Sequence, residues 1–389
     1  MLERRSFLAG AAALAALASS RAAFAAAPTD RRFVLVLLRG GLDGLHALSP
    51  HGDQDYRRRR PTLALSPDPV LDLDGYFGLH PALGDLMPLY RAGELLLVPA
   101  AATRYRDRSH FDGQNMLENG SGKPYGAEDG WLNRAILGLN GGDRRLGLAL
   151  GPAVPLILQG PARVRSWSDS DLPAADEDFL ARMTVAYQHD PLFAAALRDA
   201  RGGAKPAVAM GDMAGEPRPA QVYIKAARAA ADLLARPDGP RVAVLESQGW
   251  DTHFAQERRL TELLGDLSRG LLELKRGLGE AWRETVVMVV SEFGRTAAEN
   301  GSRGTDHGTG GLALLAGGAV AGGRIVGDWP CLSDRALYEG RDVLAANAYE
   351  RLFKAVLIGH LGLDLGFVED RVFPASRAQS PMNGLFRRA

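Results

Sequence analysis

The sequence predicts an α/β layered fold with a largely parallel central sheet, and two observations predict it. Short, fully apolar runs recur along the 389 residues, each bounded by glycine, proline or a charged residue. Stretches with the apolar spacing of an α-helix lie between these runs. Strands without polar alternation are typical of a sheet that helices cover on both faces, as in parallel α/β proteins.

The first expected strand is 33–38, an apolar run that ends in the glycine turn Gly40-Gly41. Four later runs have the same character, and we expect further strands at 94–98, 241–245, 285–290 and 311–315. Helical spacing predicts helices at 81–92, 220–235, 255–282 and 345–360.

Two segments carry no such spacing. The charged, proline-bearing segment 53–74 is expected to be an exposed connection or lid, and the Gly-, Ala- and Pro-rich segment 201–219 a surface loop. Because the runs on both sides of the second segment share the same buried character, we expect 30–389 to form a single domain.

Residues 1–25 have the layout of a cleavable export signal. Arg4-Arg5 precede an apolar run, as in twin-arginine signals, and Ala23-Phe24-Ala25 fits a cleavage site. The apolar run is about 11 residues long, short of the roughly 20 that cross a bilayer. We therefore expect export by the twin-arginine machinery and a periplasmic or secreted mature protein that does not span the membrane. A frayed N-terminal helix is the alternative.

The net charge and the cysteine count limit the partners and the metal ligands that the chain could use. Lys and Arg together number 46, as do Asp and Glu, so the net charge is zero and does not favour nucleic acid or an anionic membrane as a partner. The single cysteine, Cys331, excludes a disulfide within the chain and a zinc site of several thiolates. A metal would therefore be held by Asp, Glu and His.

Such residues follow the expected strands, where ligands of α/β sheets usually bind. The candidate metal ligands are Asp43, Asp251, His253, Glu292, Asp306 and His307. Carboxylates and imidazoles together suit one or two divalent ions, such as zinc, manganese, calcium or magnesium. Each residue alone has a structural alternative, such as a turn for Asp43, a helix cap for Asp251 and an ion pair with Arg295 for Glu292.

The candidate catalytic residues are Ser109, His110 and Arg295. Ser109 fits the N-cap of a helix that follows the 94–98 strand. Alternatively, the Ser109 hydroxyl or the His110 imidazole at this helix start would present a nucleophile to an anionic group. The guanidinium of Arg39 or Arg295 would suit the anionic oxygens of an ester substrate.

Six motifs occur in order along almost the whole mature chain. They are Arg39-Gly-Gly-Leu-Asp-Gly-Leu45, His80-Pro-Ala-Leu83, Arg108-Ser-His-Phe-Asp112, Gly249-Trp-Asp-Thr-His253, Ser291-Glu-Phe-Gly-Arg-Thr296 and Gly304-Thr-Asp-His-Gly-Thr-Gly-Gly311. Together they resemble the motifs of the family called domain of unknown function 1501 (DUF1501), in the alkaline phosphatase and sulfatase superfamily. The resemblance implies an alkaline phosphatase-like α/β/α sandwich with a metal site at strand ends. It also implies metal ligands at Asp43, Asp251, His253 and His307, and a nucleophile in the Ser109-His110 region.

One position departs from the superfamily pattern. Glu292-Phe293 stands where such phosphatases usually carry Asp-His, so an apolar ring replaces one imidazole and a second metal would be weaker or absent. The sequence leaves two functions open: an exported metal-dependent hydrolase of phosphate or sulfate esters, and a non-catalytic exported binding protein on the same scaffold. A metal-free serine hydrolase is disfavoured because the chain has no G-x-S-x-G elbow.

Overall fold

The structure is a computed structural model that describes residues 29–65, 70–140, 146–169, 177–188, 190, 197 and 219–387. The expected export signal and residues 201–218 of the expected surface loop lie outside the described residues. Among the helices described, none is both long and apolar enough to cross a membrane.

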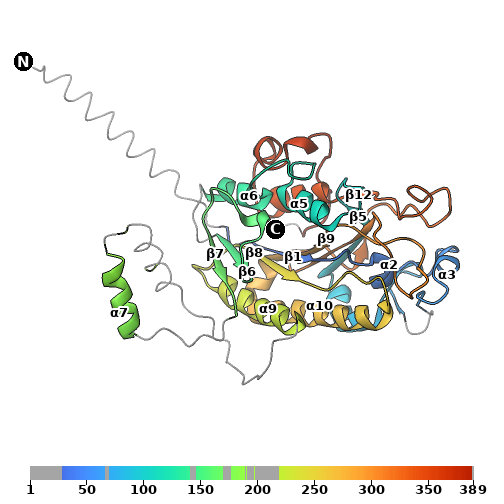
Figure 1. Ribbon diagram of the computed structural model, residues 1–389, viewed down its shortest axis with the longest axis horizontal. Coiled ribbons are helices and arrows are strands. Elements are labelled where there is room, and N and C mark those ends of the chain that lie inside the picture. The colour runs from blue at the N-terminus through green and yellow to red at the C-terminus, as the bar shows by residue number, and fades with distance from the viewer. Residues whose placement is uncertain are drawn as a thin grey trace, which may run out of the picture.

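A nine-stranded sheet forms the centre of the described molecule (Figure 1). Its order is β11-β5-β10-β9-β1-β8-β6-β7, with β12 paired to β5. The strands are β1 (Arg32–Leu38), β5 (Leu95–Ala102), β6 (Gly147–Leu150), β7 (Val164–Trp167), β8 (Val242–Ser247), β9 (Thr285–Ser291), β10 (Gly311–Ala316), β11 (Arg324–Ile325) and β12 (Asn347–Ala348). All five expected strands are present, and the prediction of a largely parallel sheet is confirmed.

The central strand β1 pairs in parallel with β8 and β9, and β6 pairs in parallel with β7 and β8. Strand β10 is antiparallel to both of its neighbours, β5 and β9. The chain that leaves β9 and enters β10 therefore stays at the carboxyl edge of the parallel strands. This edge collects the loops after β1, β8 and β9.

The apolar run of β1 packs on both faces of the sheet because successive side chains of a strand point to opposite sides. Val34, Val36 and Leu38 belong to the core that includes residues of α9 (Pro219–Ala235) and α10 (Gln256–Leu278). Phe33, Leu35 and Leu37 belong to the opposite core, with residues of α6 (Trp131–Asn140) and α11 (Tyr349–Lys354). Figure 1 shows α9 and α10 below the sheet and α5 and α6 above it.

The expected helices are found with changes in their winding. Residues 81–92 form a 3₁₀ segment followed by α4. Of the expected helix 345–360, only 349–360 are helical, as α11 followed by a π-helical turn, and residues 347–348 form strand β12 instead. The remaining helical segments are α2 (Gly44–Ala47), α3 (Tyr56–Arg59), η1 (Pro81–Leu86), α4 (Met87–Arg91), α5 (His110–Asn119), η2 (Leu156–Leu158), α7 (Glu177–Ala186), η3 (Gly279–Glu284), η4 (Ala355–His360), α12 (Leu365–Phe367), η5 (Val368–Val372) and η6 (Pro374–Ser376). A small antiparallel sheet joins β2 (Leu48–Ser49), β4 (Gly78–Leu79) and β3 (Leu71–Asp72).

The segment 53–65 differs from the exposed connection expected there. It contains α3, and the side chains of Tyr56 and Arg60 are fully buried. Arg60 can be buried because its guanidinium donates to both carboxylate oxygens of Asp43. The four consecutive arginines 57–60 therefore do not all face solvent.

Candidate metal centre

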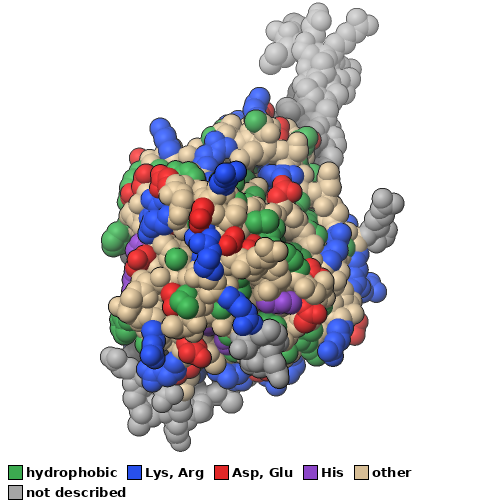
Figure 2. All heavy atoms as spheres, turned by 90° about the vertical axis from the view of Figure 1, so that its right-hand side faces the viewer, with side chains coloured by type: hydrophobic (Ala, Val, Ile, Leu, Met, Phe, Trp, Pro, Cys, Tyr) green, Lys and Arg blue, Asp and Glu red, His purple; other side chains and the backbone are tan. Residues whose placement is uncertain are grey.

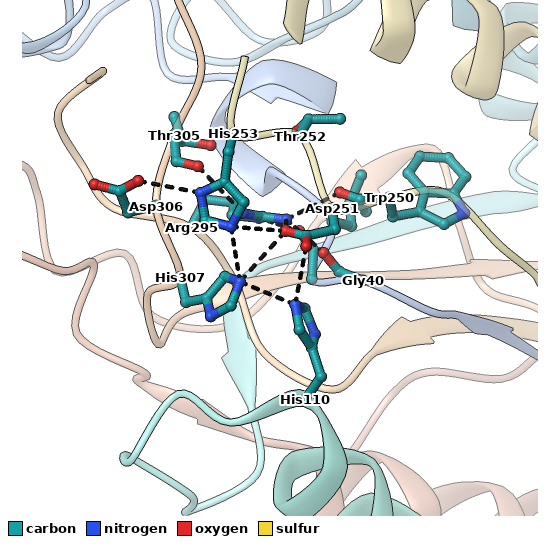
Figure 3. A network of polar contacts seen from close by, with 12 residues as sticks. Gly40, His110, Trp250, Asp251, Thr252, His253, Arg295, Thr305, Asp306 and His307 are labelled. Carbon is teal, nitrogen blue, oxygen red and sulfur yellow. Dashed lines mark hydrogen bonds and ion pairs between the residues drawn. The ribbon is translucent and has the colours of Figure 1, made fainter. Parts of the chain in front are cut away.

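The Nε2 atom of His307 faces the Nε2 atoms of His110 and His253, beside the carboxylate of Asp251 (Figure 3). His307 Nε2 lies 2.9 Å from His110 Nε2 and 3.0 Å from His253 Nε2. Asp251 oxygens lie 3.5 Å from His110 Nε2, 3.0 Å from His253 Nε2 and 3.3 Å from His307 Nε2. We call these four residues the three-histidine centre. The ligand atoms of His110, Asp251 and His307 lie within 4.8 Å of one another, as a shared ion requires.

The four side chains reach this point from three separate segments. His110 is the first residue of α5, Asp251 and His253 lie in the loop after β8, and His307 lies between β9 and β10. Glycine permits the close approach of the last two segments, because a Cβ at Gly304 would lie 2.2 Å from the carbonyl oxygen of His253. All three segments are at the carboxyl edge of the sheet, where the sequence predicted a site.

Each histidine has an oxygen acceptor at its other ring nitrogen. Nδ1 lies 2.7 Å from Glu292 Oε1 in His110 and 3.1 Å from Asp306 Oδ1 in His253. In His307 it lies 2.9 Å from the carbonyl oxygen of Arg108, which can only accept a hydrogen bond. In neutral imidazoles these acceptors hold the proton on Nδ1, so each Nε2 presents a lone pair.

With the protons on Nδ1, the Nε2 lone pairs beside the carboxylate would be stabilised by a cation placed between them. A divalent ion fits this position, since neutral imidazole held by an oxygen acceptor at Nδ1 is the usual arrangement of a metal-binding histidine. The residues present therefore fit a metal ion, and the donor set of imidazole and carboxylate suits zinc, manganese or iron better than calcium.

The acids around the centre are ionised. Burial alone would raise the pKa of Glu292, but hydrogen bonds from His110 and Gln114 bring it below its ordinary value. Burial acts in the same way on Asp251, where the hydrogen bond and charge of Arg295 reverse the effect and lower the pKa. The pKa of Asp306 is also lowered, by hydrogen bonds from Asn300 and His253 that outweigh burial.

The imidazole of His307 is held in its neutral form. Burial lowers its pKa, and the charge of Arg295 lowers it further. The neutral form is the one that binds a metal.

Glu292 and Asp306, both expected to be metal ligands, bond instead to the ligating histidines. Glu292 is 1% exposed, and its oxygens accept from the Gly40 amide at 2.9 Å and the Ser291 hydroxyl at 2.9 Å, besides His110 and Gln114. The structure places these acids behind the imidazoles, where they orient the rings.

The structure does not bring Asp43 into the three-histidine centre. Its carboxylate lies 2.6 and 3.0 Å from the two terminal nitrogens of Arg60 and also accepts from the Gln256 amide. Burial would raise the pKa of Asp43, but the charge and hydrogen bonds of Arg60 keep it lowered. The guanidinium of Arg60 thus occupies the position beside Asp43 that a metal ion would need.

The guanidinium of Arg295 also has all its partners within the protein, and the residue is 1% exposed. It donates to Asp251 and to the carbonyl oxygens of Gly40, Gly41, Trp250 and Thr305. It therefore positions the loops of the centre. Its buried guanidinium is not directed at a surface where substrate oxygens could bind.

Ser109 is the N-cap of α5, which is one of the two alternatives expected from the sequence. Its hydroxyl accepts from the amide of Asp112 at 3.5 Å, and its own amide donates to the Tyr105 hydroxyl at 3.2 Å. His110, expected as a catalytic residue, lies in the three-histidine centre.

Phe293 closes one side of the centre. Its ring is 1% exposed and lies 4.9 Å from the His110 ring and 5.3 Å from the His307 ring, packed with Tyr105 and Met116. The ring of Phe293 thus covers the imidazoles of His110 and His307 on that side.

Sequence reasoning missed Arg60, Gln114 and Gln256. Gln114 lies one turn after His110 on α5 and donates to Glu292, so its helical spacing was a usable signal. Gln256 accepts from the hydroxyls of Thr252 and Thr305 at 2.9 and 2.7 Å, and joins the two loops that carry the ligands. No sequence pattern marks this last role.

Figure 2 shows one face of the molecule, on which acidic and basic side chains are interspersed and histidine atoms reach the surface. Neither sign of charge dominates this face, in accordance with the net charge of zero.

Comparison with known proteins identifies a family. The model of a family described as "Protein of unknown function (DUF1501)" matches residues 100–368, which confirms the resemblance seen in the motifs. No curated protein matches the chain.

Several solved structures are similar to this chain at low identity. One is Ps i-CgsB in complex with k-i-k-neocarrahexaose, with 10% identity, a TM-score of 0.43 and coverage of 91% of this chain and 77% of that chain. A second is the lipoteichoic acid synthase LtaP from Listeria monocytogenes, with 9% identity, a TM-score of 0.39 and coverage of 88% and 74%. A third is the phosphonate monoester hydrolase of Agrobacterium radiobacter, with 13% identity, a TM-score of 0.35 and coverage of 86% and 74%.

Proposed function

Because the chain belongs to the DUF1501 family, whose function is unknown, we propose its activity from its own site: it is a metal-dependent hydrolase of phosphate or sulfate esters. The observation that carries the proposal is the convergence of three Nε2 lone pairs on Asp251. The position of this centre at the first residue of α5 supports an anionic substrate, since a helix N-terminus favours negative charge.

The proposal assigns His110, His253, His307 and Asp251 as the residues that would hold the ion. A divalent ion bound there would polarise an ester oxygen and lower the pKa of water. Glu292 and Asp306 would keep the imidazole protons on Nδ1, and Arg295 would fix the orientation of Asp251. In this proposal Ser109 starts the helix, and water is the nucleophile.

The charges of the site support one ion. Asp251, Glu292 and Asp306 contribute three negative charges, and Arg295 contributes one positive charge. The two remaining negative charges are matched by a single divalent cation. Asp43, which the superfamily pattern would offer to a metal, already has its cation in Arg60.

The test measures metal content and ester hydrolysis in the same preparations. We expect about one zinc or manganese ion per chain and hydrolysis of at least one of p-nitrophenyl phosphate, bis(p-nitrophenyl) phosphate and p-nitrophenyl sulfate. Both should be lost in His307→Ala. The matched control is His51→Ala, because His51 bonds only to Asp72 among the contacts described and lies outside the centre. A folded wild type that takes up no metal would contradict the proposal.

A non-catalytic binding protein is the second candidate, and one observation favours it. The guanidinium of Arg295 is bonded to the protein, that of Arg108 bonds to Glu339 and Asp342, and that of Arg341 bonds to the His307 carbonyl oxygen and Asp342. These three nearby cations therefore already have partners. Stoichiometric metal without hydrolysis of any of the three esters would support this candidate over the hydrolase.

We also propose that residues 1–25 direct export through the twin-arginine machinery, so that the mature protein works in the periplasm or outside the cell. The support is the pair Arg4-Arg5 followed by an apolar run. Expression of the full chain in a bacterium should place the processed protein in the periplasm. The double variant Arg4→Lys/Arg5→Lys should stay in the cytoplasm, and export that is unaffected by it would refute this proposal.

A further inference from the structure

Large aromatic side chains lie exposed directly beside the ligands of the three-histidine centre. Phe111, which follows His110, is 82% exposed, and Phe254, which follows His253, is 61% exposed. Tyr125 is 67% exposed. Exposed apolar side chains that gather at one place mark binding surfaces.

Tyr125 is held against the first turns of α5, on the side that carries Phe111. Its amide donates to Asn115 Oδ1, and its hydroxyl bonds to the carboxylate of Asp112. Phe111 and Asn115 are four residues apart in the helix and so share a face. Tyr125 has a φ of 54°, a conformation that a non-glycine residue adopts only when its surroundings hold it there.

Phe254 is held on the other side of the centre. The guanidinium carbon of Arg259 lies 5.0 Å from the centre of its ring, within the range of a cation–π contact. One face of the ring thus has a partner, while the side chain as a whole remains largely exposed.

His110 and His253 both reach the same atom, Nε2 of His307, and each is followed by one of the exposed phenylalanines. We propose that Phe111, Tyr125 and Phe254, the aromatic rim, bind a saccharide ring, which carries the ester that the centre would cleave. The identity of this substrate as an ester rests on the proposed function, whereas the binding of the saccharide does not.

The chemistry around the rim favours a saccharide over other ring-bearing ligands. Asp112 accepts from the Tyr105 hydroxyl at 3.3 Å, and the half-exposed carboxylate of Asp306 accepts from the Asn300 amide next to His253. Such groups accept hydrogen bonds from hydroxyls, while the ring faces suit the apolar C–H face of a sugar. A lipid or an aryl group would cover the exposed carboxylate of Asp306 without offering it a hydrogen bond.

The test uses saturation-transfer NMR with three neutral disaccharides: lactose, cellobiose and N,N′-diacetylchitobiose. At least one should bind the metal-loaded wild type, and its affinity should fall by about tenfold in each of Phe111→Ala and Phe254→Ala, because each removes one stacking ring. Leu365→Ala is the matched control, since Leu365 is an exposed apolar residue of α12. Its affinity should equal that of the wild type.

A second arm separates this proposal from the proposed function. The disaccharide should still bind His307→Ala, which is expected to lack metal and activity. Saccharide binding can therefore be measured even if the protein hydrolyses no ester. The proposal is overturned if none of the three sugars binds. It is equally overturned if binding is the same in the two phenylalanine variants, or if p-nitrophenol binds the rim and the sugars do not.

Discussion

Two aspartates at the same edge of the sheet have opposite surroundings. Asp43, after β1, is 1% exposed and faces the guanidinium of Arg60. Asp251, after β8, has a side chain that is 44% exposed and faces three imidazole nitrogens. Each carboxylate has a guanidinium supplied by the chain, Arg60 for Asp43 and Arg295 for Asp251, but only Asp251 also faces imidazole nitrogens. The imidazoles around Asp251 and its exposure, rather than a missing counter-charge, therefore distinguish it from Asp43 as a candidate metal ligand.

The first prediction tests whether Arg60 is the essential partner of Asp43. Arg60→Met would leave a buried carboxylate without its cation, and we expect the free energy of unfolding to fall by about 3–5 kcal/mol. Urea unfolding of the metal-free protein at pH 7 measures this change. The metal content of the folded variant should stay at the wild-type level.

The double variant Asp43→Asn/Arg60→Met is the control for that prediction. It removes the buried charge together with its partner, so it should be more stable than Arg60→Met alone. A single variant as stable as the wild type would show that Asp43 does not depend on Arg60.

The second prediction concerns the acid behind His110. Glu292→Gln keeps an oxygen acceptor for Nδ1 but removes its charge, so zinc affinity should fall by roughly 10- to 100-fold. Competition with a chromophoric chelator measures the affinity. Glu246→Gln is the matched control, because Glu246 also lies near the end of a strand but bonds to Arg39. Equal losses in both variants would contradict a specific role for Glu292.

The third prediction tests whether the two regions are coupled. Gln256 is buried and bonds to Asp43 on one side and to Thr252 and Thr305 on the other. Gln256→Met removes these bonds at similar volume, and misplacement of the two ligand loops should lower zinc affinity by about three- to tenfold, as expected for the loss of one or two hydrogen bonds. The same chelator competition measures this change. Unchanged affinity would mean that the Asp43 region does not support the centre.

The sequence predicted the fold in more detail than the site. Continuous apolar runs identified β1, β5, β8, β9 and β10, because a strand covered on both faces has no polar alternation. The four-residue strands β6 and β7 were missed, since so short a run carries too little pattern.

The site was predicted as a set of residues but not as an arrangement. Asp251 and His307 lie in the centre as expected, whereas Asp43 does not, because its partner Arg60 comes from an arginine run that reads as solvated. The placement of Glu292 behind His110 depends on which ring nitrogen faces it. Such contacts are set by the packing of α5 on the sheet, which no local pattern encodes.

The smallest expected effect is that, in the metal-free protein, the stability contributions of His307 and Asp43 are lost in different pH ranges. The pKa of His307 is lowered by burial and by the nearby Arg295, so the folded state binds its proton less readily than the unfolded chain. The stability that neutral His307 contributes is therefore complete above the ordinary histidine pKa of about 6.5 and is lost as the pH falls below it. The pKa of Asp43 is also lowered, but from an ordinary value of about 3.9, so its contribution persists to lower pH and is lost only below that value. Urea unfolding between pH 7 and pH 5 should show a smaller loss of stability in His307→Gln than in the wild type, while Asp43→Asn should follow the wild-type slope. A His307→Gln variant with the wild-type slope would show that the imidazole of His307 is not held neutral by its surroundings.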